Sequence, residues 1–451
     1  MKQNLHLHLI SVLAAMSIPA LSMAADFRAV QSGSWSDPAT WGLEAGAALP
    51  GAEDTVFFND GVSVTLTDEV TISTIGYTNN NTASAYLNIS GPSAVLNVTS
   101  GQSQFWYNNR LNIRLTDGAT MTAGSISWGD GGYSNIYIEN SSYTGVFDQF
   151  RGSLVDDGSF LSLKSTNGAT SQFVASGDLR LNPTSDGYKM NVTASGKGAN
   201  FNMNGKTFAL NAQKGTANLV VSDGALFTGQ NVEIENNEGA TNSISVFGSG
   251  TNLDAFIVRV GSGSKAAAAA GSSSTLNLGG FDSNGNFVAA GPSAVTNNWE
   301  FFVTESGRVN FYIGAENLSA TQSLNLEDAI LAGEFVKTFE GALSLDFSYV
   351  DTSNIADGSY YVSLISSTET LFNGKDSATG EGFTTTMDDW LEVLEVKDGE
   401  NVKFEDLILS EDTKIMYALV NVTSAVPEPS TYALIFGAIS LIFVLKRRRA
   451  R

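Results

Sequence analysis

Residues 111–119 read LNIRLTDGA, and this short stretch contains the pattern that decides the fold. Leu111, Ile113 and Leu115 alternate with polar residues, and an Asp-Gly-Ala turn follows. Because successive side chains of a β-strand point to opposite faces, the three apolar residues share one face and the polar residues share the other. The stretch therefore predicts a half-buried strand that ends in a tight turn.

Similar alternating runs recur between about residues 61 and 315, separated by turns that contain glycine. The runs begin at Val62, Leu87, Val95, Leu111, Ile136, Leu161, Leu179, Ile244, Ile257, Leu276 and Val309. The turns are 19 to 57 residues apart, and several spacings are close to one or two multiples of 20 to 28. An irregular repeat of this size is typical of a solenoid, in which one rung cannot bury its inward face without its neighbours.

We therefore predict an all-β chain whose residues 61–315 form a right-handed parallel β-solenoid (β-helix). With about 22 residues and ~4.8 Å per rung, this region corresponds to roughly 11 or 12 rungs and a rod about 55 Å long. Asparagines at 79–81, 108–109 and 236–237 are candidates for stacked side-chain ladders. A pair of β-sandwiches is the alternative, since its strands and turns recur at roughly 8 to 12 residues.

Two shorter regions flank the predicted solenoid. Residues 25–60 contain Trp35, Trp41 and a Pro-Gly turn, and we expect an N-terminal cap in which the indoles cover the open end. Stacking of these indoles on sugar rings is the alternative. Residues 316–425 contain 21 acidic and 5 basic residues. Their strand candidates predict an acidic C-terminal β domain, or a capping sheet that protects the last sheet edge.

Residues 1–24 have the pattern of a signal peptide. A lysine precedes an apolar core at 9–21, and Ser22 and Ala24 occupy the positions that a signal peptidase reads. Both histidines of the chain, His6 and His8, lie in this segment, and the chain has no cysteine. The sequence therefore excludes Ser-His-Asp triads, Cys-His pairs, imidazole or thiolate metal sites and disulfides from the mature chain.

The expected mature chain is strongly acidic. Between Asp26 and Val426 there are 18 basic and 45 acidic residues, which give a net charge of −27. Nucleic acids and anionic lipids bind proteins through Lys and Arg, so the charge excludes a nucleic-acid partner. We expect no cofactor and no metal.

The last 26 residues read VPEPSTYALIFGAISLIFVLKRRRAR and divide into three parts. The first part is the motif Pro427, Glu428 and Pro429. An apolar run of 14 residues follows from Tyr432 to Leu445. As a helix it is about 21 Å long, which is short for a hydrocarbon core of roughly 30 Å. The third part is a basic end that resists translocation: Lys446, Arg447, Arg448 and Arg449.

This order of motif, apolar run and basic end resembles the PEP-CTERM sorting signal, the tail that exosortase recognises in Gram-negative bacteria that make exopolysaccharide. The resemblance implies an exported protein that enters the inner membrane during sorting and then reaches the cell surface, the outer envelope or the extracellular matrix. Its implied partners are signal peptidase, an exosortase-type sorting enzyme and, transiently, the membrane. A plain tail anchor is the alternative.

The body of the chain carries a second resemblance. The sequence WSDPATW at 35–41, followed by PGAEDTV at 50–56, is similar to the opening of bacterial surface β-helix proteins, including autotransporter-like passengers. Pectin hydrolases and lyases also have β-helix folds, so a pectin-lyase-like body implies a carbohydrate-active enzyme as one alternative. Glycoside hydrolysis requires two carboxylates roughly 5 to 9.5 Å apart. Asp156 and Asp157 are an adjacent acidic pair just before a turn glycine in the predicted solenoid, and the companion motifs of pectin hydrolases are absent from the sequence.

Aromatic residues suggest a binding site. Trp106, Tyr107 and Trp128 are candidates for stacking on extracellular polysaccharide, and filling of the rung interiors is the alternative for them. The sequence as a whole predicts a non-catalytic surface or extracellular-matrix protein associated with exopolysaccharide or biofilm. A polysaccharide hydrolase or lyase and a polysaccharide-binding adhesin are the alternatives.

Overall fold

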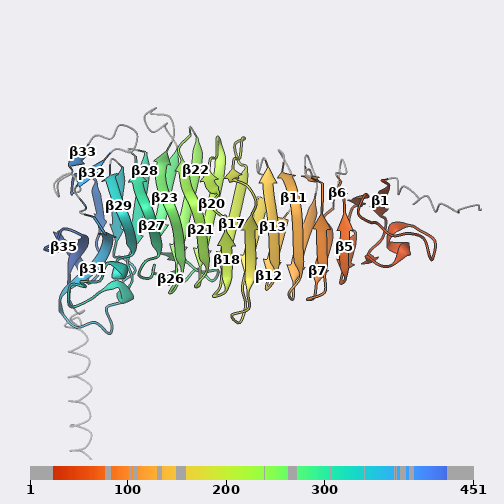
Figure 1. The fold of residues 1–451 in the computed structure, drawn as a ribbon. Coiled ribbons are helices and arrows are strands. Elements are labelled where there is room, and N and C mark those ends of the chain that lie inside the picture. Colours follow the sequence, from red (N-terminus) through yellow and green to blue (C-terminus); the bar gives the residue numbers. More distant parts are fainter. Residues whose placement is uncertain are drawn as a thin grey trace, which may run out of the picture.

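The strands of this chain alternate between two large sheets, and the alternation builds an elongated rod (Figure 1). The structure is a computed structural model that describes residues 24–76, 83–100, 103–105, 110–128, 135–148, 159–237, 239–262, 272–304, 306–339, 341–369, 371, 373–375, 382–384 and 391–423. The sequence colours run in order along the rod, so each turn of the chain stacks on the preceding turn.

The first large sheet has 13 strands in sequence order, and all of its pairings are parallel. Its strands are β2 (Gly33–Ser34), β4 (Ser63–Leu66), β7 (Ala85–Ser90), β10 (Leu111–Thr116), β12 (Asn135–Glu139), β14 (Ser159–Lys164), β17 (Lys189–Ser195), β20 (Gly215–Ser222), β22 (Ala240–Phe247), β24 (Ser273–Leu278), β28 (Gly307–Tyr312), β30 (Ala342–Asp346) and β34 (Leu394–Lys397).

The second large sheet has 16 strands and receives the intervening strands of each turn. Its strands are β5 (Glu69–Ile72), β8 (Val95–Val98), β9 (Ser103–Phe105), β11 (Thr120–Trp128), β13 (Ser142–Asp148), β15 (Ser171–Ala175), β16 (Leu179–Leu181), β18 (Ala199–Asn202), β19 (Thr207–Leu210), β21 (Leu226–Glu235), β23 (Asn252–Ser262), β27 (Val295–Val303), β29 (Leu331–Phe339), β31 (Gly358–Ser367), β35 (Val402–Leu409) and β36 (Ile415–Val422). Two parallel sheets that each gain strands with every turn are consistent with a β-solenoid.

The remaining elements are short. At the N-terminal end a three-stranded sheet contains β1 (Asp26–Ala29), β3 (Thr55–Phe58) and β6 (Thr74–Ile75). Two antiparallel hairpins are formed by β25 (Gly280–Phe281) with β26 (Phe287–Val288) and by β32 (Asn373–Lys375) with β33 (Gly382–Thr384). The 3-10 helices are η1 (Pro38–Trp41), η2 (Ala315–Asn317) and η3 (Leu326–Asp328).

A column of inward-facing aliphatic residues runs through the 13-stranded sheet. Its members pair in register and are buried: Val64, Leu87, Ile113, Ile136, Leu161, Val192, Leu219, Ile244, Leu276, Val309 and Leu343. Successive members are 23 to 34 residues apart, so the predicted rung of about 22 residues is too short. Excursions such as the hairpin β25–β26 account for the longer rungs.

A column of stacked aromatic rings fills part of the interior beside the 16-stranded sheet. Tyr143, Phe173, Phe201 and Phe227 pair in register on β13, β15, β18 and β21, and all four are buried. Their successive ring centroids are 5.6, 4.3 and 5.1 Å apart. Burial raises the pKa of the Tyr143 hydroxyl, which keeps this ring uncharged. The column therefore adds ring stacking to the burial of apolar surface.

The N-terminal region encloses its two predicted cap tryptophans. Trp35 and Trp41 are buried, and their ring centroids lie 4.8 Å apart. The Trp41 indole donates a hydrogen bond from Nε1 to the Trp35 carbonyl oxygen at 2.9 Å. Asp37 caps η1 by accepting a hydrogen bond from the backbone N–H of Ala39. Buried indoles have no face free for a sugar ring, and their burial favours the cap.

Residues 316–425 continue both large sheets. β29 pairs with β27, and β30 pairs with β28, with parallel strands in each case. The 16-stranded sheet then ends in two antiparallel pairings, β31 with β36 and β36 with β35. The antiparallel strands lie at the blue end of the rod in Figure 1.

The predicted signal peptide and sorting tail fall almost entirely outside the described residues, which begin at residue 24 and end at residue 423. Within the part of the chain that the structure describes, no helix has the length and apolar character needed to cross a membrane.

Candidate functional site

Most of the residues singled out in the sequence lie where the structure gives no description. These are Trp106, Tyr107, the pair Asp156 and Asp157, and the whole sorting tail with Pro427, Glu428 and Pro429. Trp128 is the last residue of β11, where its backbone pairs with Phe105, and its side chain is not described. The predictions made for these residues therefore stay predictions.

One of the predicted asparagine positions does form a ladder. Asn237 donates from Nδ2 to Asn211 Oδ1 at 2.8 Å and to the carbonyl oxygen of Ala212 at 3.0 Å. Asn211 and Asn237 are 26 residues apart, which is one turn of the chain. The asparagines at 79–81 and 108–109 are outside the described residues.

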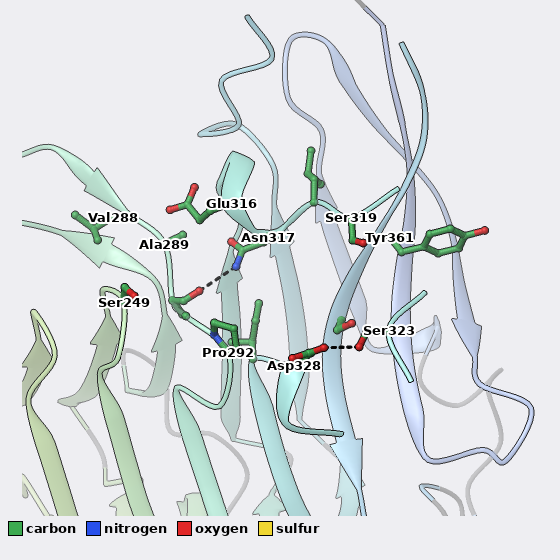
Figure 2. A pocket seen from close by; sticks show the side chains of 15 residues that line it. Ser249, Val288, Ala289, Pro292, Glu316, Asn317, Ser319, Ser323, Asp328 and Tyr361 are labelled. Carbon is green, nitrogen blue, oxygen red and sulfur yellow. Dashed lines mark hydrogen bonds between the residues drawn. The ribbon is translucent and has the colours of Figure 1, made fainter. Parts of the chain in front are cut away.

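A large cavity of about 510 Å³ lies near the C-terminal end of the rod (Figure 2). It is lined by Ser249, Val288, Ala289, Ala290, Gly291, Pro292, Glu316, Asn317, Leu318, Ser319, Ser323, Asp328, Ile330, Tyr361 and Ser363. The lining combines an apolar wall with hydroxyl, amide and carboxylate groups, and it comes from segments that are more than 100 residues apart in the sequence. A cavity of this size falls in the range of small-molecule sites.

Two carboxylates line the large cavity from different segments. Figure 2 shows Glu316 and Asp328 on different sides of it. The Ser323 hydroxyl donates to Asp328 Oδ2, and the Asn325 amide donates to Asp328 Oδ1 at 3.3 Å. Asn317 bridges the wall by donating to the carbonyl oxygen of Ala290 at 2.9 Å. The lining of the large cavity therefore includes both acidic and hydrogen-bonding groups.

A second concave site, which we call the aromatic groove, lies over the outer face of the 13-stranded sheet. Its volume is about 280 Å³, and it is lined by Val220, Ser245, Phe247, Asn277, Gly279, Gly280, Phe281 and Tyr312. The hairpin β25–β26 lies close against this face, because a Cβ atom at Gly280 would come within 2.6 Å of the Phe247 ring. Glycine at position 280 is therefore required for the close approach.

Aromatic rings cluster at one border of the aromatic groove. Phe281, Phe287 and Tyr349 pack together with ring centroids 4.5 to 6.0 Å apart, and Tyr312 lies 6.1 Å from Tyr349. Phe281 is 48% exposed, so part of its ring is accessible to solvent at the groove. Burial is the main cause that raises the pKa of the Tyr312 hydroxyl, so this ring stays neutral at physiological pH.

The floor of the aromatic groove is a polar ladder. Asn310 donates from Nδ2 to Asn277 Oδ1 at 2.7 Å, and Asn277 donates from Nδ2 to Ser245 Oγ at 3.3 Å. These residues occupy matching positions on β28, β24 and β22. An amide has two donors and two acceptor lone pairs, so these two bonds leave Asn277 with further hydrogen-bonding capacity.

A lysine lies beside the aromatic cluster. Lys397 Nζ is 3.1 Å from Asp346 Oδ2 and 5.7 Å from the centroid of the Tyr349 ring. Its hydrogen bond to Asp346 is the main cause that raises the pKa of Lys397. The pair is exposed on the lysine side, so its contribution to stability is small. The charges of Lys397 and Asp346 therefore offset each other beside the aromatic cluster.

A further group of charged residues lies on β21 and its neighbours. Burial raises the pKa of Glu235, the charge of Glu233 adds to this effect, and Arg180 opposes it. Arg180 lies 3.7 Å from Glu235, and Arg259 lies 3.2 Å from Glu233. Each carboxylate thus has an arginine partner, and the group forms a structural ion-pair network on the outer face.

No group of three or more His, Cys, Asp or Glu side chains in the described part of the chain is arranged to hold a metal ion.

The aromatic groove is not among the sites predicted from the sequence, although one local signal of it is present. Residues 281–287 read FDSNGNF, in which two phenylalanines flank a turn rich in Asp, Asn and Gly. Asp282 Oδ1 accepts hydrogen bonds from the backbone N–H groups of Asn284 and Asn286, both at 2.8 Å. This pattern predicts a hairpin with both rings at its base.

No family model, no curated protein and no solved structure matches the chain.

Proposed function

We propose that this chain is a non-catalytic, exported β-helix protein of the cell surface or extracellular matrix, associated with exopolysaccharide or biofilm. In this proposal signal peptidase removes residues 1–24, and an exosortase-type enzyme processes the tail at 426–451. The protein enters the inner membrane during sorting and then reaches the surface, the outer envelope or the matrix. The solenoid is right-handed, because parallel β connections are right-handed in nearly all proteins.

The polar outer face of the 13-stranded sheet is the observation that carries this proposal. Asn218 donates to Asn191 Oδ1 at 3.0 Å, and Ser243 donates to Asn218 Oδ1 at 2.7 Å. A second column, two residues further along the strands, contains Ser245, Asn277 and Asn310. Such columns place amide and hydroxyl groups at the regular spacing of the rungs, about 4.8 Å. A hydrated polymer of sugars offers complementary hydroxyl groups at many positions along a rod of this kind.

Two features of the sequence support a non-catalytic role outside the cell. The mature chain has neither histidine nor cysteine, which leaves carboxylates as its principal groups for acid–base chemistry. Its net charge of −27 keeps such a chain soluble and makes it repel nucleic acid. The rod is held together by buried aliphatic and aromatic columns, so it needs no disulfide in an oxidising compartment.

Intact mass spectrometry of the protein recovered from its native envelope and medium tests the sorting step. We expect a mass that lacks residues 1–24 and everything after the region of Pro427. A Glu428→Ala variant should keep the tail, and a Ser430→Ala variant, which changes a neighbouring residue outside the motif, should be processed normally. A mature wild-type protein that retains residues 432–451 would contradict the proposal and would identify the tail as a plain anchor.

A carbohydrate-active β-helix enzyme is the second candidate, and the large cavity favours it. Glu316 and Asp328 both line this cavity, and glycoside hydrolysis uses a pair of carboxylates. Incubation with polysaccharide and measurement of new reducing ends distinguishes the two functions. The non-catalytic proposal requires no release above that of a Glu316→Gln, Asp328→Asn double variant. Release that disappears in both single variants would establish the enzyme.

A further inference from the structure

The aromatic groove combines the two kinds of surface that a sugar ring offers. A hexose has apolar C–H faces and a rim of hydroxyl groups that both donate and accept hydrogen bonds. Phe281 presents a ring that is 48% exposed, and the floor beneath it is the amide and hydroxyl ladder of Asn277 and Ser245. Ligand sites of this type pair apolar walls with a few placed polar groups.

Two neighbouring aromatic rings pack against the ring of Phe281 and hold it in place. Phe287 lies 6.0 Å from it with an angle of 73° between the rings, and Tyr349 lies 5.4 Å from it at 81°. Phe287 and Tyr349 are themselves stacked at 4.5 Å. The Asp282 turn fixes the two strands that carry Phe281 and Phe287. An exposed ring that is already fixed loses little conformational entropy when a ligand stacks on it.

The charges near the groove indicate a neutral ligand. The eight residues that line the aromatic groove include no charged side chain. Two cations act on the Tyr312 side chain, and each is paired with a carboxylate: Arg308 with Glu395 at 2.6 Å and Lys397 with Asp346 at 3.1 Å. The mature chain carries a net charge of −27, which repels an anionic polymer. An uncharged polysaccharide therefore fits the groove better than a polyuronate does.

We infer that the aromatic groove binds a hexose unit of a neutral polysaccharide, with Phe281 stacked on the sugar face and Asn277 and Ser245 hydrogen-bonded to its hydroxyls. This inference rests on the proposed extracellular role and names the ligand class for it. In this inference the rest of the polysaccharide chain lies along the rod, where the polar columns of the 13-stranded sheet contact the neighbouring units.

Titration calorimetry of the mature protein tests the inference. The probes are neutral hexa-saccharides of the glucan, mannan and galactan types, a hexa-uronate, an apolar peptide rich in phenylalanine, and the neutral polysaccharide extracted from the producing cells. We expect at least one neutral sugar to bind. Phe281→Ala should weaken that binding by about tenfold or more, and Phe281→Trp should keep it.

Phe256→Ala is the matched control, because Phe256 is a phenylalanine of the 16-stranded sheet with 38% exposure. It should change the affinity by less than about twofold, since surface changes away from a site have small effects. Asn277→Ala should weaken binding without changing the circular dichroism spectrum, because its side chain lies on the outer face.

Three results would overturn the inference: no binding of any neutral probe, equal binding by wild type and Phe281→Ala, or stronger binding of the uronate or the peptide. The mass measurement on the same material separates this inference from the proposed function. A processed protein that binds no neutral sugar would refute sugar binding by the groove and leave the sorting proposal in place. An unprocessed protein whose sugar binding depends on Phe281 would refute the proposed sorting and support sugar binding by the groove.

Discussion

Replacement of Phe201 by alanine should destabilise the middle of the rod. Phe201 is fully buried, and its ring centroid lies 4.3 Å from that of Phe173 and 5.1 Å from that of Phe227. Truncation of a buried phenylalanine costs about 3 to 5 kcal/mol, and each stacked pair contributes roughly 0.5 to 1.5 kcal/mol beyond burial. Because Phe201→Ala removes two stacked contacts, we expect a cost near the upper limit, about 4 to 5 kcal/mol.

Hydrogen exchange measured by mass spectrometry is the appropriate assay, since a long array of rungs does not unfold as one unit. Peptides from β15, β18 and β21 should exchange faster in Phe201→Ala, while peptides from β1 and β3 should be unchanged. Phe256→Ala is the control, because Phe256 is 38% exposed and its loss should cost roughly 1 kcal/mol. The reasoning is refuted if the two variants have the same exchange rates in β18.

Two further predictions concern the cap and the hairpin. Trp41→Phe removes the hydrogen bond from the indole Nε1 to the buried carbonyl oxygen of Trp35, and the local free energy of opening measured by hydrogen exchange in η1 should fall by about 1 to 3 kcal/mol; unchanged exchange there would contradict this. The backbone N–H of Asn286 holds the pKa of Asp282 below its ordinary value of 3.8, so the carboxylate stabilises the hairpin above pH 3.8 and this contribution is lost as the pH falls through the folded pKa. Amide exchange of the hairpin in wild type and Asp282→Ala should therefore differ at about pH 6 and converge once the pH is below the folded pKa of Asp282, and a difference that persists after this carboxylate is protonated would count against this role.

The alternation of apolar and polar residues was predictable because it is a local property. Leu111, Ile113 and Leu115 alternate in the sequence, and all three are buried on β10. Gly118 follows the strand with a φ of +88°, a conformation that favours glycine, as the predicted turn requires. Trp35 and Trp41 are also buried, as expected for large aromatic residues near the start of the chain.

The sequence at 281–287 indicates the hairpin, but the assembly of the aromatic groove was not predictable from local pattern. Phe281, Tyr312 and Tyr349 are far apart in the sequence and come from a hairpin, a strand and a loop. They meet because β24, β28 and β30 stack in register. The sequence instead suggests Trp106, Tyr107 and Trp128 as sugar-stacking residues, since a cluster of aromatic residues is visible in the sequence only where the residues are close neighbours.

The sequence by itself determined the alternation of apolar and polar residues along the strands, the lack of cysteine, the restriction of histidine to positions 6 and 8, and the net negative charge, because each of these depends only on residue identity and short-range order. The tertiary structure decided the register. Paired residues of successive rungs are 23 to 34 residues apart in the sequence. Which residues of two neighbouring parallel strands pair is set by the burial of the whole inward column. Since that burial is shared among all the rungs, only the assembled stack brings Phe281 over the ladder at Asn277 and forms the groove.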